Sequence, residues 1–368
     1  MIAISRSAFS KKIESASIGA FRSRYSPIGI DFGSAQIKII QLCHHRGRIA
    51  LYRKAIVPTP AGSVKDGRIN KPEPLIDVLK KVRQSAGFNK NKANLALCSQ
   101  SFFLRRVTLP PMKNAEIKKA MRWEVEKYFP LSSSEAVFDY CLIVKSAEMN
   151  NSSSDYLLAA AAKETADIYT TVAQKAGFYP ASLEIEPLAR FRALCLSGQA
   201  DRDRANTCQA LLNIGHGSTS LLIACGGSFQ FYRNIKFGID NLCRHVAESK
   251  SLNCHEAYQL IFSRGTLVER GLQEAAEELA LEIGQSLSYW YEQSARTEPQ
   301  MDEVKICGGG AAVPGLAAYI AGRLQLKARL FSPLPTGSVK CRSLTPKQKF
   351  EGALCTAAYG LALRGWLT

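Results

Sequence analysis

The stretch that organises the chain is residues 28–42, which read Ile28-Gly29-Ile30-Asp31-Phe32-Gly33-Ser34-Ala35-Gln36-Ile37-Lys38-Ile39-Ile40-Gln41-Leu42. Two apolar runs rich in Ile flank a Gly-Ser-Ala-Gln turn, in which Gly33 supplies the permissive backbone that a tight hairpin needs. The pattern predicts strand, turn and strand. One acid, Asp31, lies in the first apolar run, and a buried carboxylate is unfavourable unless it is paired or holds a cation. Asp31 is therefore a candidate binding residue.

A similar stretch recurs in the second half of the chain, at residues 211–223, which read Leu211-Leu212-Asn213-Ile214-Gly215-His216-Gly217-Ser218-Thr219-Ser220-Leu221-Leu222-Ile223. Both stretches combine an apolar strand, one polar residue, a turn with Gly and Ser, and a second apolar strand. Two such hairpins predict two related lobes that face each other. Turns of this kind present successive backbone N–H groups, which suits phosphate.

Length and composition set the class of protein. The 368 residues, 46% of them apolar, are enough for two domains with separate cores. No apolar run approaches the roughly 20 residues that span a bilayer. The 11 Cys are dispersed without a Cys-x-x-Cys pair, which disfavours a zinc site or a secreted disulfide framework. We expect reduced, mostly buried thiols in a cytosolic protein.

The chain is strongly basic, with 48 Lys and Arg against 31 Asp and Glu, a formal charge of +17. This charge favours anionic partners such as phosphates, nucleic acid or a membrane surface, or it is a scattered surface excess. Helix-turn-helix, zinc-finger and RNP signatures are absent, so nucleic acid is an unexpected partner. Residues 1–26 form a basic tail, either disordered or an amphipathic helix that could touch an anionic membrane.

The order of apolar patterns predicts an α/β chain with two lobes. Residues 27–187 form the first lobe, with an inserted small α/β subdomain at about residues 102–150, and a strand at 155–162 returns to this lobe. Residues 188–345 form the second lobe. A final helix in residues 346–368, capped by Thr345 with Pro346 at its first position, packs back on the first lobe.

A third segment with binding chemistry is residues 304–316, a strand that ends in Gly308-Gly309-Gly310-Ala311 and is followed by a helix with Pro314 in its first turn. Glycines let a ligand approach the backbone closely, and a helix N-terminus beside such a turn suits an anion or a nucleotide. The Walker signature is absent, which disfavours a P-loop enzyme.

Together the three segments resemble the nucleotide-contacting segments of the actin, Hsp70 and sugar kinase superfamily. Within it the chain is most similar to the PilM family, the actin-like proteins of type IV pilus assembly. The resemblance is carried by residues 28–42, 65–69, 106–110, 128–130, 188–194, 233–238, 282–289 and 308–316. It implies an α/β fold of the actin-like (ribonuclease H-like) type, with two lobes and the inserted subdomain.

The resemblance also implies a site for ATP or ADP with Mg²⁺. Asp31 and the turn 33–36 would bind phosphate from the first lobe, residues 215–219 would do so from the second, Glu278 and Glu282 would lie near ribose and adenine, and residues 309–311 near adenosine. Asp31 would also hold the Mg²⁺. The candidate nucleotide-binding residues are Asp31, Gly33, Ser34, Ala35, Gln36, Lys38, Asn213, Gly215, Gly217, Ser218, Thr219, Glu278, Glu282, Gly308, Gly309, Gly310 and Ala311.

The partner that the resemblance implies is the cytoplasmic N-terminal peptide of a PilN-type inner-membrane protein. Family members bind it in a groove beside the inserted subdomain, which would make residues 102–140 the partner-binding region. We therefore expect a cytoplasmic scaffold, peripheral at the inner membrane. Self-association and direct membrane contact are left open.

One residue, Asn213, departs from the superfamily pattern at a position that affects ATP hydrolysis. Superfamily members that hydrolyse ATP readily usually carry Asp where this chain has Asn213, and an amide lacks the negative charge that helps to hold Mg²⁺. We expect nucleotide binding with slow or absent hydrolysis, and no motif assigns a catalytic residue. The alternative is an active ATPase or sugar kinase of the same fold, which needs a carboxylate base, for which Glu184 or Glu186 is available.

Overall fold

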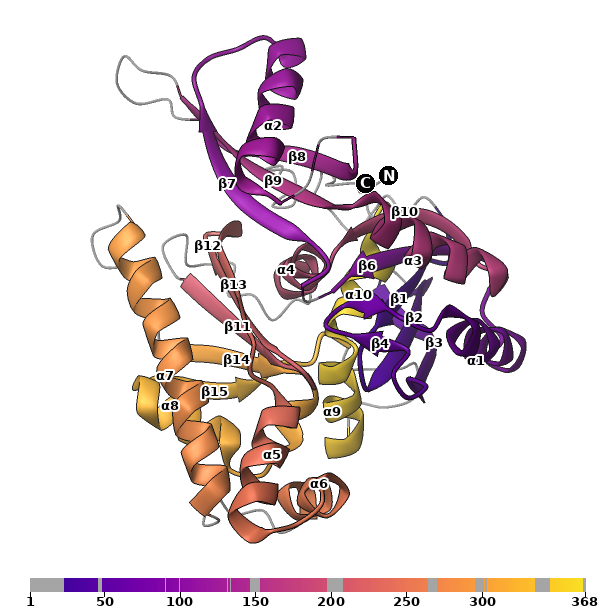
Figure 1. Cartoon of the computed structure of the whole chain (residues 1–368). Helices are drawn as coiled ribbons and strands as arrows, with labels where there is room; N and C mark the ends of the chain where they lie inside the picture. The colour runs from indigo at the N-terminus through magenta and orange to yellow at the C-terminus, as the bar shows by residue number, and fades with distance from the viewer. Residues whose placement is uncertain are drawn as a thin grey trace. The chain divides into compact units, whose positions relative to one another are not determined.

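The computed structural model describes residues 23–45, 48–89, 91–98, 100–130, 132, 134–145, 153–196, 208–263, 270–294, 301, 303–334 and 345–366 (Figure 1). The chain divides into two compact units: Met1–Ala193 with Ala357–Thr368, and Leu194–Thr356. Residues 1–22 of the expected basic tail lie outside the described residues. Within the part that is described, no helix combines the length and the apolar character needed to cross a bilayer.

The first unit is built on a five-stranded sheet in the order β10-β6-β1-β2-β3. Strand β1 pairs antiparallel with β2 and parallel with β6, which in turn is parallel to β10. All five residues of β1 are buried, as expected for a central strand covered on both faces. The strands are β1 (Ile28–Phe32), β2 (Gln36–His45), β3 (Arg48–Pro58), β6 (Lys92–Leu97) and β10 (Tyr179–Ile185), with a small hairpin of β4 (Val64–Lys65) and β5 (Arg68–Ile69).

Helices complete this unit: α1 (Pro72–Ser85), α3 (Lys163–Lys175), α4 (Glu186–Leu196) and α10 (Thr356–Leu363). Helix α10 packs so closely on the sheet that a Cβ on Gly29 would lie 2.0 Å from the carbonyl oxygen of Ala358. Only glycine at this position of β1 allows the contact. The side chain of Asn94 on β6 donates hydrogen bonds to the carbonyl oxygens of Leu361 and Arg364, at 2.9 and 3.1 Å. The last helix is therefore part of the core of the first unit.

A second, three-stranded sheet in this unit has the antiparallel order β7-β9-β8. Its strands are β7 (Phe103–Leu109), β8 (Ala136–Lys145) and β9 (Ser154–Ala162), and α2 (Asn114–Tyr128) packs on it through the expected buried stripe of Ile117, Met121 and Val125. We expected the strand at 155–162 to return to the first lobe, which is wrong. It is the central strand of this sheet, because its small buried residues, such as Ala159, fit between two neighbouring strands.

The second unit repeats the plan of the first, with a five-stranded sheet in the order β13-β12-β11-β14-β15. An antiparallel meander is followed by parallel strands, as in the first unit. The strands are β11 (Cys208–Ile214), β12 (Thr219–Cys225), β13 (Ser228–Ile235), β14 (Glu303–Cys307) and β15 (Lys327–Leu330). The helices are α5 (Ile239–Lys250), α6 (Cys254–Ser263), α7 (Arg270–Gln293), α8 (Leu316–Leu324) and α9 (Pro346–Leu354), with a 3₁₀ turn η3 (Gly309–Ala312).

Two further expectations are corrected in this region. Cys208 and Cys225, expected as thiols, form a disulfide between the paired ends of β11 and β12. The two cysteines are 17 residues apart and belong to no recognisable cysteine motif. The register of the β11–β12 hairpin brings them together. The expected single C-terminal helix is two helices, α9 and α10, interrupted at Cys355. The cap by Thr345 is present, since its hydroxyl accepts a hydrogen bond from the N–H of Gln348 at 3.2 Å.

Candidate functional site

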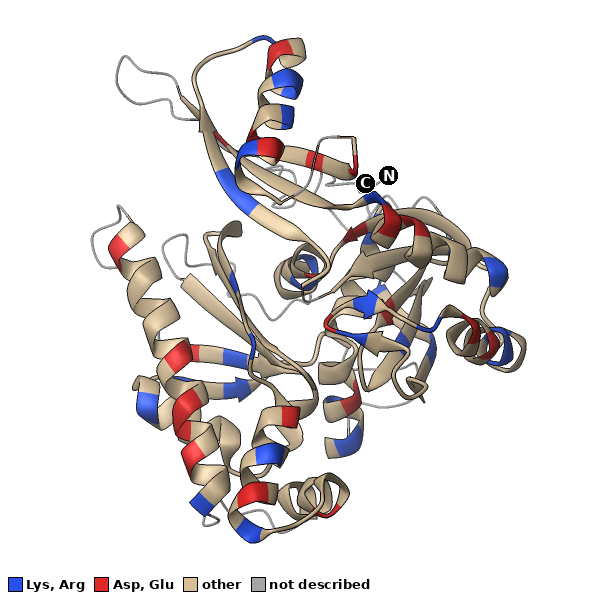
Figure 2. Ribbon diagram, viewed as in Figure 1, with Lys and Arg blue, Asp and Glu red and all other residues tan. Residues whose placement is uncertain are grey.

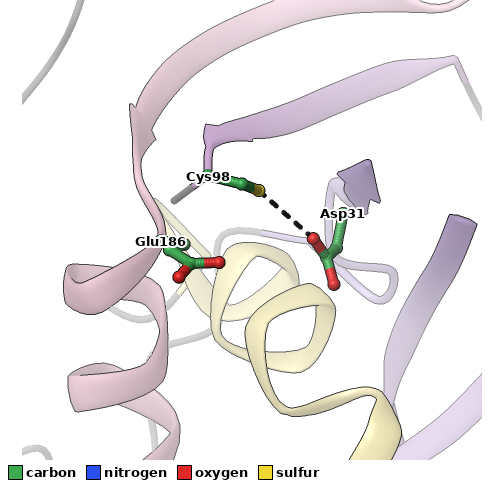
Figure 3. A group of neighbouring side chains, drawn as sticks. All are labelled: Asp31, Cys98 and Glu186. Carbon is green, nitrogen blue, oxygen red and sulfur yellow. Dashed lines mark hydrogen bonds between the residues drawn. The ribbon is translucent and has the colours of Figure 1, made fainter. Parts of the chain in front are cut away.

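Asp31 lies near the carboxyl end of β1 and is 3% exposed. The ammonium group of Lys38, its partner across the β1–β2 hairpin, is 3.2 Å from Oδ2. The thiol of Cys98, which follows β6, donates to Oδ1 at 3.4 Å (Figure 3). The buried acid is therefore paired with one cation and contacted by one thiol, which explains how it is tolerated in an apolar strand.

Glu186 joins this group from a third element, the first residue of α4, directly after β10. Strands β1, β6 and β10 are parallel, so their carboxyl ends meet at the same edge of the sheet. One ligand atom from each of Asp31, Cys98 and Glu186 lies within 4.8 Å of the others (Figure 3). Sequence reasoning missed Cys98 and offered Glu186 only as a base for the alternative enzyme. The signal for Cys98 was its position directly after the buried strand β6, whereas Glu186 follows a strand of which only the last three residues are buried.

Burial raises the pKa of both Glu186 and Cys98. The pKa of Glu186 is raised by burial and then by the charge of Asp31, against the opposing effect of Arg190, whose guanidinium is 2.8 Å from Oε1. The pKa of the Cys98 thiol is raised well above its usual range by burial and then by the charges of Asp31 and Glu186. Without a bound cation, Cys98 is therefore a neutral thiol at neutral pH.

The turn at residues 33–36 is braced from β3. The hydroxyl of Thr59 donates to the carbonyl oxygen of Gly33 at 2.6 Å, and its N–H donates to that of Ala35 at 2.9 Å. Gly33, Ser34 and Gln36 are half-buried, and Ala35 is exposed. The turn is thus fixed in shape and remains accessible to a ligand.

In the second unit, Asn213 holds the position on β11 that Asp31 holds on β1. The thiol of Cys307 on β14 contacts its Oδ1 at 3.7 Å, as Cys98 contacts Asp31. A Cβ on Gly308 would lie 2.7 Å from the same oxygen. Gly308 also has a φ of 84°, which favours glycine. The structure therefore brings Asn213 and the glycine segment together.

The turn at 215–218 is tied to the N-terminus of α5. The N–H groups of Ile239 and Asp240 donate to the carbonyl oxygens of Gly215 and His216, at 3.0 and 2.9 Å. The hydroxyl of Thr219, the first residue of β12, is buried and has no hydrogen-bond partner within the described part of the chain. An unpaired buried hydroxyl is unfavourable, which marks Thr219 as a group that a ligand could satisfy.

The segment after β14 differs in detail from our expectation. Gly309, Gly310 and Ala311 form the 3₁₀ turn η3, and α8 begins only at Leu316, so Pro314 precedes the helix. Two consecutive glycines favour a tight turn over the start of an α-helix, because glycine loses more conformational entropy in a helix than other residues do.

Glu278 and Glu282 lie on α7, where acidic residues recur along the helix (Figure 2). Glu278 is 3.4 Å from His245, and Glu282 is 3.7 Å from Arg233, and both carboxylates are partly exposed. In the described ranges, neither ion pair includes a residue of the glycine segment 308–311.

A family model described as type IV pilus assembly protein PilM matches residues 29–366. The chain belongs to this family. It is similar to a solved structure of the PilM-PilN type IV pilus biogenesis complex, with 25% identity and a TM-score of 0.81, covering 93% of this chain and 99% of that chain.

Two more distant structures share the fold alone. The ethanolamine utilization protein EutJ from Carboxydothermus hydrogenoformans is 16% identical with a TM-score of 0.56, and 96% of this chain and 100% of that chain are covered. MreB5 of Spiroplasma citri bound to AMPPNP is 14% identical with a TM-score of 0.50, and 92% and 95% are covered. The actin-like α/β fold expected for a PilM-family chain is thereby confirmed.

Proposed function

We propose that the chain is a nucleotide-binding scaffold of type IV pilus assembly, which binds the N-terminal peptide of a PilN-type membrane protein. The observation that carries the proposal is the family match over residues 29–366, together with the likeness over nearly the whole chain to a PilM-PilN complex. Through this partner the protein would work at the cytoplasmic face of the inner membrane.

The proposed nucleotide is ATP or ADP, and each unit offers one candidate phosphate-binding turn, at residues 33–36 in the first unit and at 215–219 in the second. Support comes from the accessible, braced first turn and from the unpaired buried hydroxyl of Thr219 in the second. Mg²⁺ fits Asp31, a buried carboxylate whose Oδ1 accepts a hydrogen bond from the thiol of Cys98 at 3.4 Å. Bound there, the ion would neutralise phosphate charge.

The nucleotide proposal is tested by isothermal titration calorimetry with ATP and ADP, with and without Mg²⁺. We expect binding that weakens on Thr219→Val, which keeps the shape of the side chain and removes the hydroxyl. The matched control is Thr170→Val on α3, whose hydroxyl donates to the carbonyl oxygens of Ala166 and Asp167 in its own helix. Equal affinity in wild type and Thr219→Val would remove Thr219 from the site, and absence of binding would refute the nucleotide proposal.

We place the peptide groove at a cavity of about 740 Å³ in the first unit, lined by α1, α3 and, among the described residues of the expected region 102–140, only Ser134 and Glu135. Its lining includes the apolar side chains of Ile76 and Ile168, and four acids outnumber the two lysines, Lys163 and Lys175. The acids are Glu73, Glu135, Glu164 and Asp167. Apolar contacts with surrounding acids suit an extended peptide that has apolar and basic side chains.

Fluorescence anisotropy with a labelled PilN-type N-terminal peptide tests the groove. Ile168→Arg places a long cation in the cavity, and we expect affinity to fall more than about tenfold, since loss of a central contact costs about 2 kcal/mol. Gln174→Arg, an exposed position of the same helix outside the cavity, is the matched control. Equal affinity of both variants would place the peptide elsewhere.

A second function, ATP hydrolysis, is favoured by one observation. Glu186 is a buried carboxylate beside Asp31, and burial raises its pKa, as a general base requires. Steady-state phosphate release that disappears on Glu186→Gln, with nucleotide affinity retained, would support an ATPase. Release that is unchanged by this variant would exclude Glu186 as the base.

A further inference from the structure

A thiol and two carboxylates meet at the carboxyl edge of the first sheet, on three different elements. Asp31, Cys98 and Glu186 are 3%, 5% and 5% exposed. Their ligand atoms lie within 4.8 Å of one another, and Figure 3 shows the Glu186 carboxyl group directed toward the side of Asp31 and Cys98. Three strand ends hold these side chains, so the cluster is preorganised.

The spacing of one pair in the cluster, Cys98 and Asp31, is that of a zinc-type site. The sulfur of Cys98 is 3.4 Å from Oδ1 of Asp31. A tetrahedral ion at about 2.3 Å from a thiolate and about 2.0 Å from a carboxylate oxygen holds these two ligand atoms about 3.5 Å apart. Replacing the shared proton by an ion therefore needs almost no movement of this pair.

Neighbouring cations bind carboxylate oxygens of the cluster. Lys38 is at Oδ2 of Asp31, at 3.2 Å, and Arg190 is at Oε1 of Glu186, at 2.8 Å. Such outer contacts orient metal ligands. A divalent ion, one thiolate, two carboxylates and these two cations sum to one positive charge, which leaves a favourable fourth position for an anion.

We propose that Asp31, Cys98 and Glu186 bind a thiophilic divalent cation of the zinc class, without a nucleotide. The thiolate decides the class of ion, because sulfur ligands select zinc-type ions whereas Mg²⁺ takes oxygen ligands in octahedral geometry. Binding releases the thiol proton of Cys98 to solvent. The proposal does not depend on nucleotide binding, and it gives the cluster a role that phosphate recognition does not require.

Cobalt(II) titration of the reduced, metal-free full chain tests this site, because thiolate ligation gives Co²⁺ a charge-transfer absorption band. We expect a band that saturates at one equivalent, that Zn²⁺ abolishes and that Mg²⁺ leaves unchanged. Cys98→Ser removes the band. Cys254→Ser, which alters an exposed cysteine of the second unit, retains it. A band that survives Cys98→Ser, or no band in the wild type, overturns the proposal.

A second variant keeps the test decisive if Cys98→Ser fails to fold. Glu186→Gln retains the thiol, so we expect the band to remain and the Co²⁺ affinity to fall more than about tenfold, a loss that even outer contacts can cause. Unchanged affinity in a folded Glu186→Gln variant contradicts the assignment. Calorimetry with ATP is run separately, so failure of nucleotide binding and failure of metal binding are distinguished.

Discussion

Replacing Glu184 by Gln should strongly destabilise the first unit. Glu184, at the end of β10, is fully buried, and its carboxylate accepts hydrogen bonds from Arg192 at 2.7 and 2.9 Å and from Arg364 beyond α10. Removal of the carboxylate leaves two buried guanidinium groups without their anion. Breaking a buried ion pair by removing one partner costs about 3–5 kcal/mol.

The expected loss on Glu184→Gln is large compared with the total free energy of unfolding. Domains are stable by about 5–15 kcal/mol, so a loss of about 3–5 kcal/mol is at least about a fifth of that free energy of unfolding. The matched control is Glu274→Gln, which breaks an exposed pair with Arg270 on α7 and should cost about 0.5 kcal/mol or less.

Urea unfolding followed by Trp fluorescence is the assay, because Trp366 is buried in the first unit and Trp290 in the second. The two units can unfold separately, so each transition is fitted on its own. A cost below about 1 kcal/mol for Glu184→Gln would refute the claim that this carboxylate compensates both guanidinium groups.

The pH dependence gives an independent check on Glu184. Burial raises the pKa of its carboxyl group, but the charges and hydrogen bonds of Arg192 and Arg364 outweigh burial, and the net pKa is lowered. A lowered folded-state pKa stabilises the protein above the unfolded-state pKa of about 4.3, and this contribution is lost as the pH falls through the folded-state value. The difference between wild type and Glu184→Gln should therefore narrow below about pH 4. A constant difference would contradict the ion-pair explanation.

Three further outcomes are expected. Gly29→Ala should lower the melting temperature of the first unit, since its Cβ would lie 2.0 Å from a backbone oxygen of α10 and overpacking costs about 1–3 kcal/mol. The control, Gly322→Ala in α8, has open space around it and should stabilise the protein by up to about 1 kcal/mol. Equal effects of the two substitutions would contradict the close packing at Gly29. Peptide mapping by mass spectrometry without reductant should recover Cys208 linked to Cys225, and reduction should destabilise the second unit by about 3 kcal/mol in urea unfolding. Asn213→Asp should strengthen Mg²⁺-dependent ATP binding in calorimetry, because it adds a negative charge for the ion; weaker binding would argue against a phosphate-site role for this position.

Local patterns predicted much of this protein. Hairpin signals located both turns with their single polar residues, and helical periodicity located the buried stripes of α2 and α7. These features depend on residues that are close in sequence, where side-chain spacing alone determines which face is buried.

The parts that could not be predicted depend on strand order and register. Cys98 and Glu186 reach Asp31 only because β6 lies beside β1 and β10 beside β6, all three in parallel, an order that composition and spacing do not encode. The disulfide of Cys208 depends in the same way on the register of one hairpin. The central place of β9 in the small sheet depends on its pairing with β7, which is separated from it by α2 and β8 along the chain.

The chain leaves the first unit after Ala193 and returns to it only at Ala357. During synthesis, when the first 193 residues have emerged from the ribosome, Glu184 and Asn94 still lack the arginine and the carbonyl groups that α10 and the residues after it supply. Folding of the first unit therefore cannot be completed until the second unit has been made. Until then the carboxylate of Glu184 has only one of its two arginines, and one face of the sheet lacks the helix α10 that covers it. This order of events makes the early half of the chain a natural client for chaperones.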